Sequence, residues 1–152
     1  MARDLFHNQV KVALEKDGWT ITHDPYSIKI SEVIKVQIDL GAESTIRATH
    51  RQANAARQDQ EKIAVEITSF VSDSDINEFH GALGQYLNYA KALTIEDPNR
   101  TLYLAIPVDT YTDFFQVPFI QATLQDYQIN LIVYEPSQEV IQQWINFNST
   151  DN

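Results

Sequence analysis

The chain has 152 residues, with 11 Lys and Arg against 21 Asp and Glu and a formal charge of −10 at pH 7. Its 43% apolar content can build the core of one domain, whereas no apolar run approaches the ~20 residues of a membrane span. Without cysteine, disulfides, zinc–thiolate sites and a cysteine nucleophile are excluded, and residues 1–4 lack the apolar stretch of a signal peptide. We therefore expect a cytoplasmic protein with one domain over residues 1–152, ordered over about 3–145 and ending in a polar tail.

Apolar periodicity and turn residues predict an alternation of helices and strands. The clearest helix covers residues 75–93, where Ser74 or Asp75 can cap the first turn and an apolar stripe follows. The expected elements, in chain order, are a helix over 4–17, strands over 19–22, 27–30, 33–39 and 62–70, the helix over 75–93, a strand over 101–107, helices over 111–115 and 118–127, a strand over 130–134, and a last helix or edge element over 140–144. Antiparallel strands first and helix-crossed strands later predict an α/β domain with a mixed central β-sheet flanked by helices.

Residues 44–60 form the one visibly basic stretch of an acidic chain. Arg47, Arg51 and Arg57 lie here, and no acid occurs between Glu43 and Asp59. The stretch has three interpretations: it contacts phosphate, it binds an acidic partner, or it is a solvated loop or exposed helix.

The net charge bears on nucleic-acid binding. DNA binders usually present a positive surface, because neutralising phosphates releases counterions and drives association. A chain with a charge of −10 repels DNA at long range. DNA is therefore possible but not favoured as a direct partner, unless a local basic patch or a second subunit supplies positive charge.

Two acids stand out by their positions. Asp39 ends a predicted strand, and Glu66 lies inside the apolar strand at residues 63–68. A charged acid inside an apolar strand costs several kcal/mol unless a metal, a cation or strong hydrogen bonds compensate it. If the two strands are neighbours, both carboxylates can bind one Mg²⁺, which prefers oxygen ligands. The alternative is that Asp39 caps a turn and Glu66 lies on the wet face of an edge strand, and spacing alone does not decide between them.

Seven segments carry a closer likeness. They are the pair Phe6-His7 and residues 16–25, 39–43, 63–67, 82–89, 102–107 and 131–134. With these segments the chain resembles the cyanobacterial XisH family over about residues 3–144, and the strand-end acid followed by Glu66 resembles the PD-(D/E)XK, restriction-endonuclease-like fold. The XisH family is named as a controlling factor for excision of the fdxN element, a DNA rearrangement, and is associated with a small partner called XisI.

The resemblance implies roles for individual residues. Asp39 and Glu66 match the metal-ligating acids of the nuclease fold, and Gln85 and Tyr89 match a Gln-x-x-x-Tyr pattern of some of its nucleases. His7 falls where such enzymes place an acidic residue or His on the first helix. Helix–sheet packing is the alternative for Gln85 and Tyr89, and partial exposure on a helix is the alternative for His7.

One departure from the nuclease pattern affects catalysis. The Lys of the Glu-x-Lys motif is replaced by Thr68. A Lys here would lie beside the metal, on the same face as Glu66, and removing such a preorganised charge costs ~10²–10³ in rate. Lys62 and Lys35 lie ~13 Å along their strands from the two acids and do not replace it.

We therefore predict a non-catalytic regulator. The chain would be an XisH-like controlling factor that binds an XisI-like partner, on a nuclease-like scaffold with a degenerate site, with Mg²⁺ and a homodimer both possible. The alternative is an active Mg²⁺-dependent DNA endonuclease. Glu43, just beyond Asp39, is a candidate for supporting the site.

Overall fold

The computed structural model describes residues 5–44, 61–71 and 74–147. The basic stretch around Arg47, Arg51 and Arg57 and the end of the polar tail lie outside the described residues. The described elements, in chain order, are α1 (His7–Lys16), β1 (Thr20–His23), β2 (Tyr26–Lys29), β3 (Lys35–Ile38), β4 (Leu40–Ser44), β5 (Glu61–Ile67), α3 (Asp75–Glu96), β6 (Arg100–Pro107), α4 (Val108–Thr112), the 3₁₀ helix η1 (Phe114–Gln116), α5 (Pro118–Tyr127), β7 (Leu131–Glu135) and β8 (Val140–Ile145).

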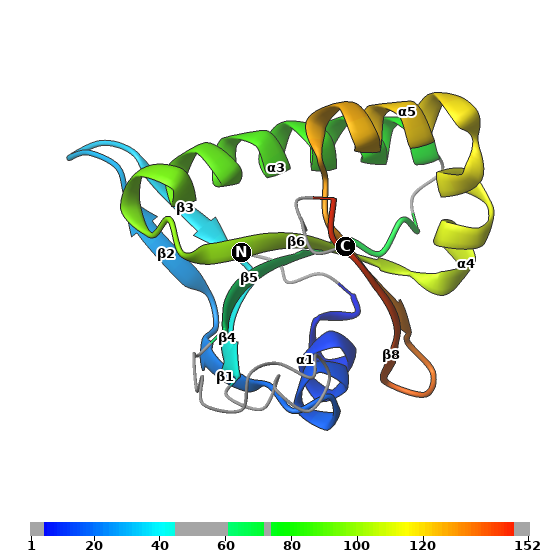
Figure 1. The fold of residues 1–152 in the computed structure, drawn as a ribbon, viewed down its shortest axis with the longest axis horizontal. Coiled ribbons are helices and arrows are strands. Elements are labelled where there is room, and N and C mark those ends of the chain that lie inside the picture. The colour runs from blue at the N-terminus through cyan, green and yellow to red at the C-terminus, as the bar shows by residue number, and fades with distance from the viewer. Residues whose placement is uncertain (1–4, 45–60, 72–73, 148–152) are drawn as a thin grey trace.

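Six strands form a mixed central sheet in the order β1-β4-β5-β6-β7-β8. The three middle strands β5, β6 and β7 run parallel, while β1, β4 and β8 are antiparallel to their neighbours. Helices α3 and α5 cover one face of the sheet, and α1 packs on the other (Figure 1). The predicted mixed α/β fold is confirmed, and β8 shows that the last element is an edge strand rather than a helix.

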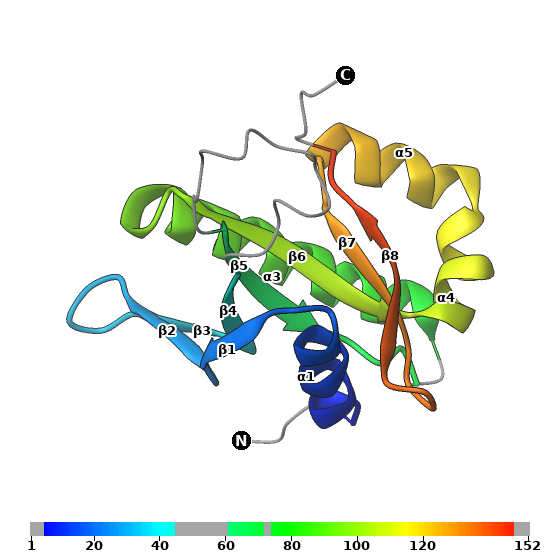
Figure 2. The ribbon, with the colours of Figure 1, turned by 60° about the horizontal axis from the view of Figure 1, so that its bottom comes forward.

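The first strands differ from the expectation in two ways. β2 and β3 pair with each other as a separate two-stranded sheet, which projects as a hairpin beyond the body of the domain (Figure 2). An unpredicted strand, β4, then follows Asp39 and enters the central sheet between β1 and β5. These differences matter for function, because β4 brings the residue before it alongside the end of β5.

Two cores lie on opposite faces of the central sheet. One face packs side chains of α3, η1 and α5, including the fully buried Phe115 and Ile120, against the sheet. The other face packs Val10 and Leu14 of α1 against β4, β5 and β7. In the part of the chain that the structure describes, no helix is both long and apolar enough to cross a membrane.

Candidate functional site

The strand ladder brings Asp39 and Glu66 together. β4 and β5 are antiparallel, and Leu40 pairs with Val65, so Asp39 lies one step beyond the ladder, beside Glu66. The main-chain N–H of Asp39 donates a hydrogen bond to Glu66 Oε1 at 3.3 Å. In the opposite direction, the N–H of Ile67 donates to Asp39 Oδ2 at 2.9 Å. The two acids therefore close the end of the β4–β5 pair, which the sequence alone did not establish.

Burial dominates the electrostatics of this acid pair. Glu66 is buried and Asp39 is half-buried. Burial raises the pKa of the Asp39 carboxyl; the hydrogen bond from Ile67, the charge of His7 and a hydrogen bond with Glu66 oppose this, and the charge of Asp24 adds to it. Because the pKa of Asp39 stays above its ordinary value, the surroundings compensate its negative charge only in part.

His7 lies on α1, where its side chain contacts Asp24, which also pairs with Lys11. Its ring is buried, and its Nε2 lies 2.8 Å from Asp24 Oδ1, while Lys11 Nζ lies 2.9 Å from Asp24 Oδ2. Burial works to raise the pKa of Asp24, but hydrogen bonds from Lys11 and His7 and their charges outweigh it, so that pKa lies below its ordinary value. The other ring nitrogen, His7 Nδ1, is buried without a hydrogen-bond partner among the described residues.

The sequence pattern points to His7 but not to its partners Asp24 and Lys11. His7 and Lys11 are four residues apart on α1, a spacing that places them on one helical face and could have been noticed. Asp24 lies in the segment 16–25, to which the sequence pattern assigns no role in the site. Its contact with α1 joins residues 17 apart in sequence, which no local pattern predicts.

Thr68 occupies the position where the nuclease resemblance would place a lysine. Its hydroxyl donates a hydrogen bond to Glu78 Oε1 at 3.4 Å, in the first turns of α3. Its carbonyl accepts a hydrogen bond from the Tyr134 hydroxyl, also at 3.4 Å. The position after the acid pair is therefore held by a short neutral side chain bonded to a third carboxylate. Glu78 was not among the predicted site residues.

The two predicted residues on α3 differ in their placement. Tyr89 is half-buried, and its pKa is raised to about 12 by burial and by the charges of Glu66 and Asp39, so its phenol lies close to the acids. Gln85, one turn earlier, is exposed, and its side chain makes no hydrogen bond within the described residues. The structure therefore brings Asp39, Glu66, His7 and Tyr89 to one region, while Gln85 stays at its margin.

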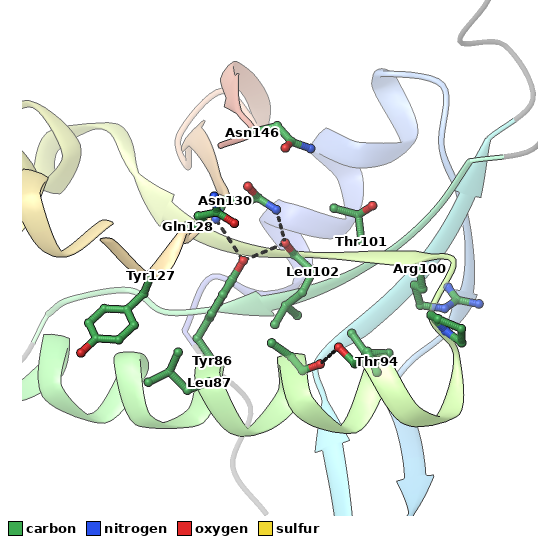
Figure 3. A pocket seen from close by; sticks show the side chains of 13 residues that line it. Tyr86, Leu87, Thr94, Arg100, Thr101, Leu102, Tyr127, Gln128, Asn130 and Asn146 are labelled. Carbon is green, nitrogen blue, oxygen red and sulfur yellow. Dashed lines mark hydrogen bonds between the residues drawn. The ribbon is translucent and has the colours of Figure 1, made fainter. Parts of the chain in front are cut away.

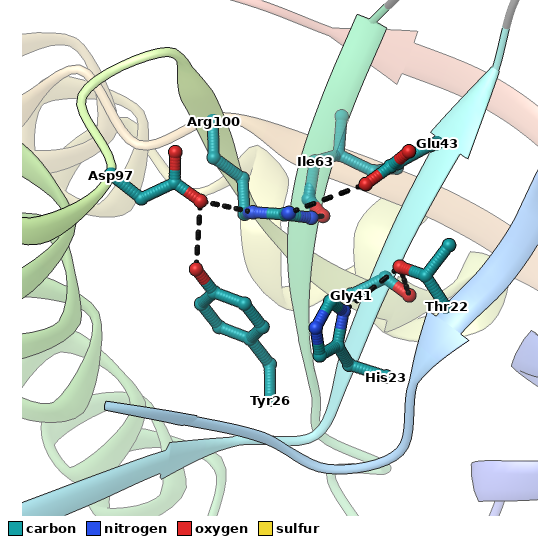
Figure 4. A network of polar contacts seen from close by, with 8 residues as sticks. All are labelled: Thr22, His23, Tyr26, Gly41, Glu43, Ile63, Asp97 and Arg100. Atoms are coloured by element: carbon teal, nitrogen blue, oxygen red, sulfur yellow. Dashed lines mark hydrogen bonds and ion pairs between the residues drawn. The ribbon is translucent and has the colours of Figure 1, made fainter. Parts of the chain in front are cut away.

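Glu43 does not support the acid pair. It lies opposite Lys62, toward the other end of the β4–β5 ladder, and its carboxylate is 3.6 Å from the guanidinium of Arg100. Figure 4 shows this second polar cluster, in which Arg100 also donates to Asp97 and to the carbonyl of Ile63, at 2.9 and 3.0 Å. The expectation for Glu43 was wrong because β4 runs away from Asp39 and carries its later residues to the opposite end of the sheet.

Arg100 is held among structural contacts and does not reach the position after Glu66, where the nuclease pattern has a lysine. Its side chain is only 3% exposed, and its guanidinium lies 4.5 Å from the centre of the Tyr26 ring. The buried guanidinium of Arg100 depends on these partners. Removing Arg100 would leave the carboxylates of Asp97 and Glu43 without their cation, which would destabilise the fold. No local pattern predicts this cluster, because its members come from β2, β4, β5, the α3–β6 turn and the start of β6.

Asp39 and Glu66 are the residues that could hold a divalent cation. Mg²⁺ sites commonly use one or two carboxylates and complete their coordination shell with water and phosphate oxygens. This pair therefore supplies as many protein ligands as a Mg²⁺ site commonly has. One oxygen of each acid already accepts a main-chain N–H. Among the described residues, no group of three or more His, Asp or Glu side chains is arranged to hold a metal.

A concave region lies beside α3, apart from the acid pair. This groove has a volume of about 560 Å³ and lies between α3, the start of β6 and the end of α5 (Figure 3). Its polar floor is bonded internally: the Tyr86 hydroxyl donates to the Leu102 carbonyl at 3.1 Å and accepts the Asn130 N–H at 3.0 Å. Its central polar groups are therefore occupied, and the acid pair remains the better candidate for a functional site.

Comparison with known proteins gives consistent relatives. A family model described as XisH protein matches residues 1–142. An XisH family protein from Nostoc punctiforme has a solved structure that is similar at 43% sequence identity and a TM-score of 0.79, covering 94% of this chain and 100% of that one. A protein from Anabaena variabilis, named as an fdxN element excision controlling factor protein, is similar at 43% identity and a TM-score of 0.80, covering 95% of this chain and 100% of that one. Among curated proteins, none matches.

Proposed function

Because this chain belongs to the XisH family, we propose that it acts as a controlling factor in the excision of a DNA element. That is the role stated in the name of the Anabaena variabilis relative for the fdxN element. In this proposal the chain is a regulatory protein that binds a partner, and it uses a nuclease-like scaffold whose site is degenerate. The strand-breaking and joining chemistry would belong to other proteins.

The proposal rests on the side chains around the acid pair, which include no lysine at position 68. A PD-(D/E)XK-like nuclease would place a lysine at position 68, whereas Thr68 is neutral and bonded to Glu78. The raised pKa of Asp39 supports the same interpretation, since a nearby ammonium group would be expected to lower it. Losing one preorganised charge lowers a reaction rate by about 10²–10³, so a metal-dependent reaction here would be slow.

A second function, that of a Mg²⁺-dependent DNA endonuclease, is favoured by the convergence of Asp39, Glu66, His7 and Tyr89. In this alternative, Asp39 and Glu66 would hold the ion. A bound Mg²⁺ supplies a more acidic water and neutralises developing negative charge on the phosphate. Asp24 would orient the His7 ring, and Lys11 would add positive charge to the α1 side of the site. Gln85, though exposed, would still be placed to contact the nucleic acid.

The experiment that separates the two is a cleavage assay on purified protein with Mg²⁺ or Mn²⁺ and both linear and supercoiled DNA. The regulatory proposal predicts that all DNA substrates stay intact. Robust cleavage that disappears in Glu66→Ala, and also in the milder Glu66→Gln, would overturn the regulatory proposal. The matched control is Glu43→Gln, which removes a carboxylate of the same type from the opposite end of the same ladder.

The proposed partner is an XisI-like protein. The charge of −10 disfavours direct contact with DNA, so a partner would provide a route to the recombination machinery without a basic surface on this chain. Co-expression with the XisI-like chain should yield a complex that survives moderate salt during co-purification. Failure to recover a complex, with both chains folded, would contradict the partner assignment.

A further inference from the structure

The outer side of α3 carries a regular line of exposed residues. Positions 76, 80, 84, 87, 91 and 95 follow one another at intervals of three or four, so they lie along one helical face. All six are exposed, and the opposite side of α3 packs Phe79, Tyr86 and Leu93 against the sheet. We call this line the outer stripe; its members are Ile76, His80, Gly84, Leu87, Lys91 and Ile95.

Three members of the outer stripe are large aliphatic residues. Ile76 and Leu87 are each 39% exposed, and Ile95 is 65% exposed. Single exposed aliphatic residues are ordinary, but three at helical spacing on one face have the pattern of a helix with a partner on that side. Tyr127 of α5, 54% exposed, lines the same groove as Leu87 and extends the apolar surface beyond α3.

The charge of this face suits a second copy of the same chain. Two chains that each carry −10 repel one another, and the repulsion is least where the contact surface carries no acid. Between Phe79 and Ile95, α3 contains no Asp or Glu and one cation, Lys91. The acids of α3 lie at its two ends, at Asp75, Glu78 and Glu96.

The order of side chains along the stripe is self-complementary when it is reversed. An antiparallel copy would place Ile76 opposite Ile95, His80 opposite Lys91, and Gly84 opposite Leu87. At Gly84 an added Cβ would meet nothing within 4 Å, so this position leaves open space into which a facing Leu87 can pack. A parallel copy would instead set Lys91 against its own equivalent and leave the two glycines facing each other.

We propose that this chain forms a two-fold symmetric dimer in which the outer stripes of two α3 helices pack antiparallel. The two-fold axis passes between residues 85 and 86, so Gly84 and Leu87 form the centre and the isoleucines form the two ends. Such an isologous contact closes on itself and uses the same surface of each copy. It leaves Asp39, Glu66 and His7 outside the contact, because these residues lie beyond the sheet-facing side of α3 or on α1.

The first test is the mass of the purified chain in solution and its response to two matched variants. Light scattering at about 10–100 µM should give about twice the chain mass of 17.4 kDa. Gly84→Glu should weaken the dimer by at least about tenfold, because it places a carboxylate of each copy near the axis. Gly81→Glu is the control: its added Cβ also meets nothing within 4 Å, but it lies about 60° around the helix from Gly84, away from the stripe.

Each outcome of this test decides the proposal. A monomeric wild-type chain, or equal effects of the two glutamates, would overturn it. A monomer that binds an XisI-like chain and loses that binding in Gly84→Glu would also overturn it, because the face would then belong to that partner. Circular dichroism of both variants checks that α3 still forms, which is expected because a glycine inside a helix is replaced by a better helix former.

The second test determines the direction of the helices. The chain has no cysteine, so Ile76→Cys and Ile95→Cys each introduce a single thiol. Mixing the two variants and oxidising them should give a cross-linked dimer, whereas either variant alone should give little. In the antiparallel dimer, identical positions lie 19 residues apart along the axis, about 28 Å, far beyond the ~7 Å Cα limit of a disulfide. Cross-linking of Ile76→Cys with itself, in place of the mixed product, would contradict the antiparallel arrangement.

Discussion

Replacing Thr68 by Lys tests whether the acid pair lacks a cation. Thr68 stands two residues after Glu66, and alternate residues of an extended chain share a face at roughly 6.6 Å. Its hydroxyl already lies 3.4 Å from Glu78 Oε1, and burial raises the pKa of the nearby Asp39. In Thr68→Lys an ammonium group would therefore enter a region that contains three carboxyl groups.

The expected gain in the free energy of unfolding is the Coulomb attraction of the lysine to the acids minus the cost of ordering its side chain. An ion pair at about 4 Å gains about 4 kcal/mol at an effective dielectric constant of ~20. Fixing the lysine side chain costs about 2 kcal/mol, and removing its ammonium from water costs a further part of the gain. We therefore expect Thr68→Lys to raise the free energy of unfolding by about 1–2 kcal/mol relative to Thr68→Met, a control of similar length without charge.

The assay is urea unfolding of the two variants at pH 7 and in acid. The lysine lowers the pKa of the folded acids, so its advantage over methionine should be present at neutral pH and should disappear as the acids become protonated. A difference of the same size at both pH values would mean that packing, not charge, produces it. No difference at pH 7, or a lysine variant less stable than the methionine variant, would refute the electrostatic account of the site.

Three further results are expected. Asp39→Asn should stabilise the protein at neutral pH but not near pH 3, as urea unfolding midpoints at the two pH values would show. The reason is that the pKa of Asp39 is raised in the folded protein, so the wild-type protein loses stability as the pH rises from the ordinary pKa of 3.8 through the folded-state pKa. Tyr86→Phe should lower the free energy of unfolding by about 1–3 kcal/mol, because the buried N–H of Asn130 loses its acceptor. A loss smaller than a few tenths of a kcal/mol in urea unfolding would contradict this. Tyr89 should titrate near pH 12, and Glu66→Gln should lower that pKa in an ultraviolet titration, because a negative charge beside the phenol is removed; an unchanged value would place Glu66 too far away.

Local patterns predicted the elements that have their own periodicity. The helix expected over residues 75–93 is α3, and the predicted cap is present, since Ser74 Oγ accepts the N–H of Asn77 at 3.3 Å. The strand expected over residues 101–107 is β6, and residues 102–107 are buried. In these segments each residue's environment is set by neighbours three or four positions away, or by alternation along one strand, so a single sequence contains the necessary information.

β4 could not be predicted from its own residues. Leu40-Gly41-Ala42-Glu43-Ser44 contains no β-branched or aromatic side chain, and its extended form depends on pairing with β1 and β5 on its two sides. Gly41 is required for a contact that is distant in sequence: an added Cβ would lie 3.1 Å from His23 Nδ1 and 3.2 Å from Tyr26 Cδ1. The cluster around Arg100 was missed for the same reason, because its partners are assembled by strand order.

The strand ladder also gives the acid pair a structural role. Since Leu40 pairs with Val65, the register sets Asp39 beside Glu66, and each acid accepts an N–H that would otherwise be left at the end of the β4–β5 pair. A half-buried N–H without an acceptor costs free energy, so either acid contributes to the fold whether or not a metal binds. The presence of Asp39 and Glu66 is therefore not by itself a sign of nuclease activity.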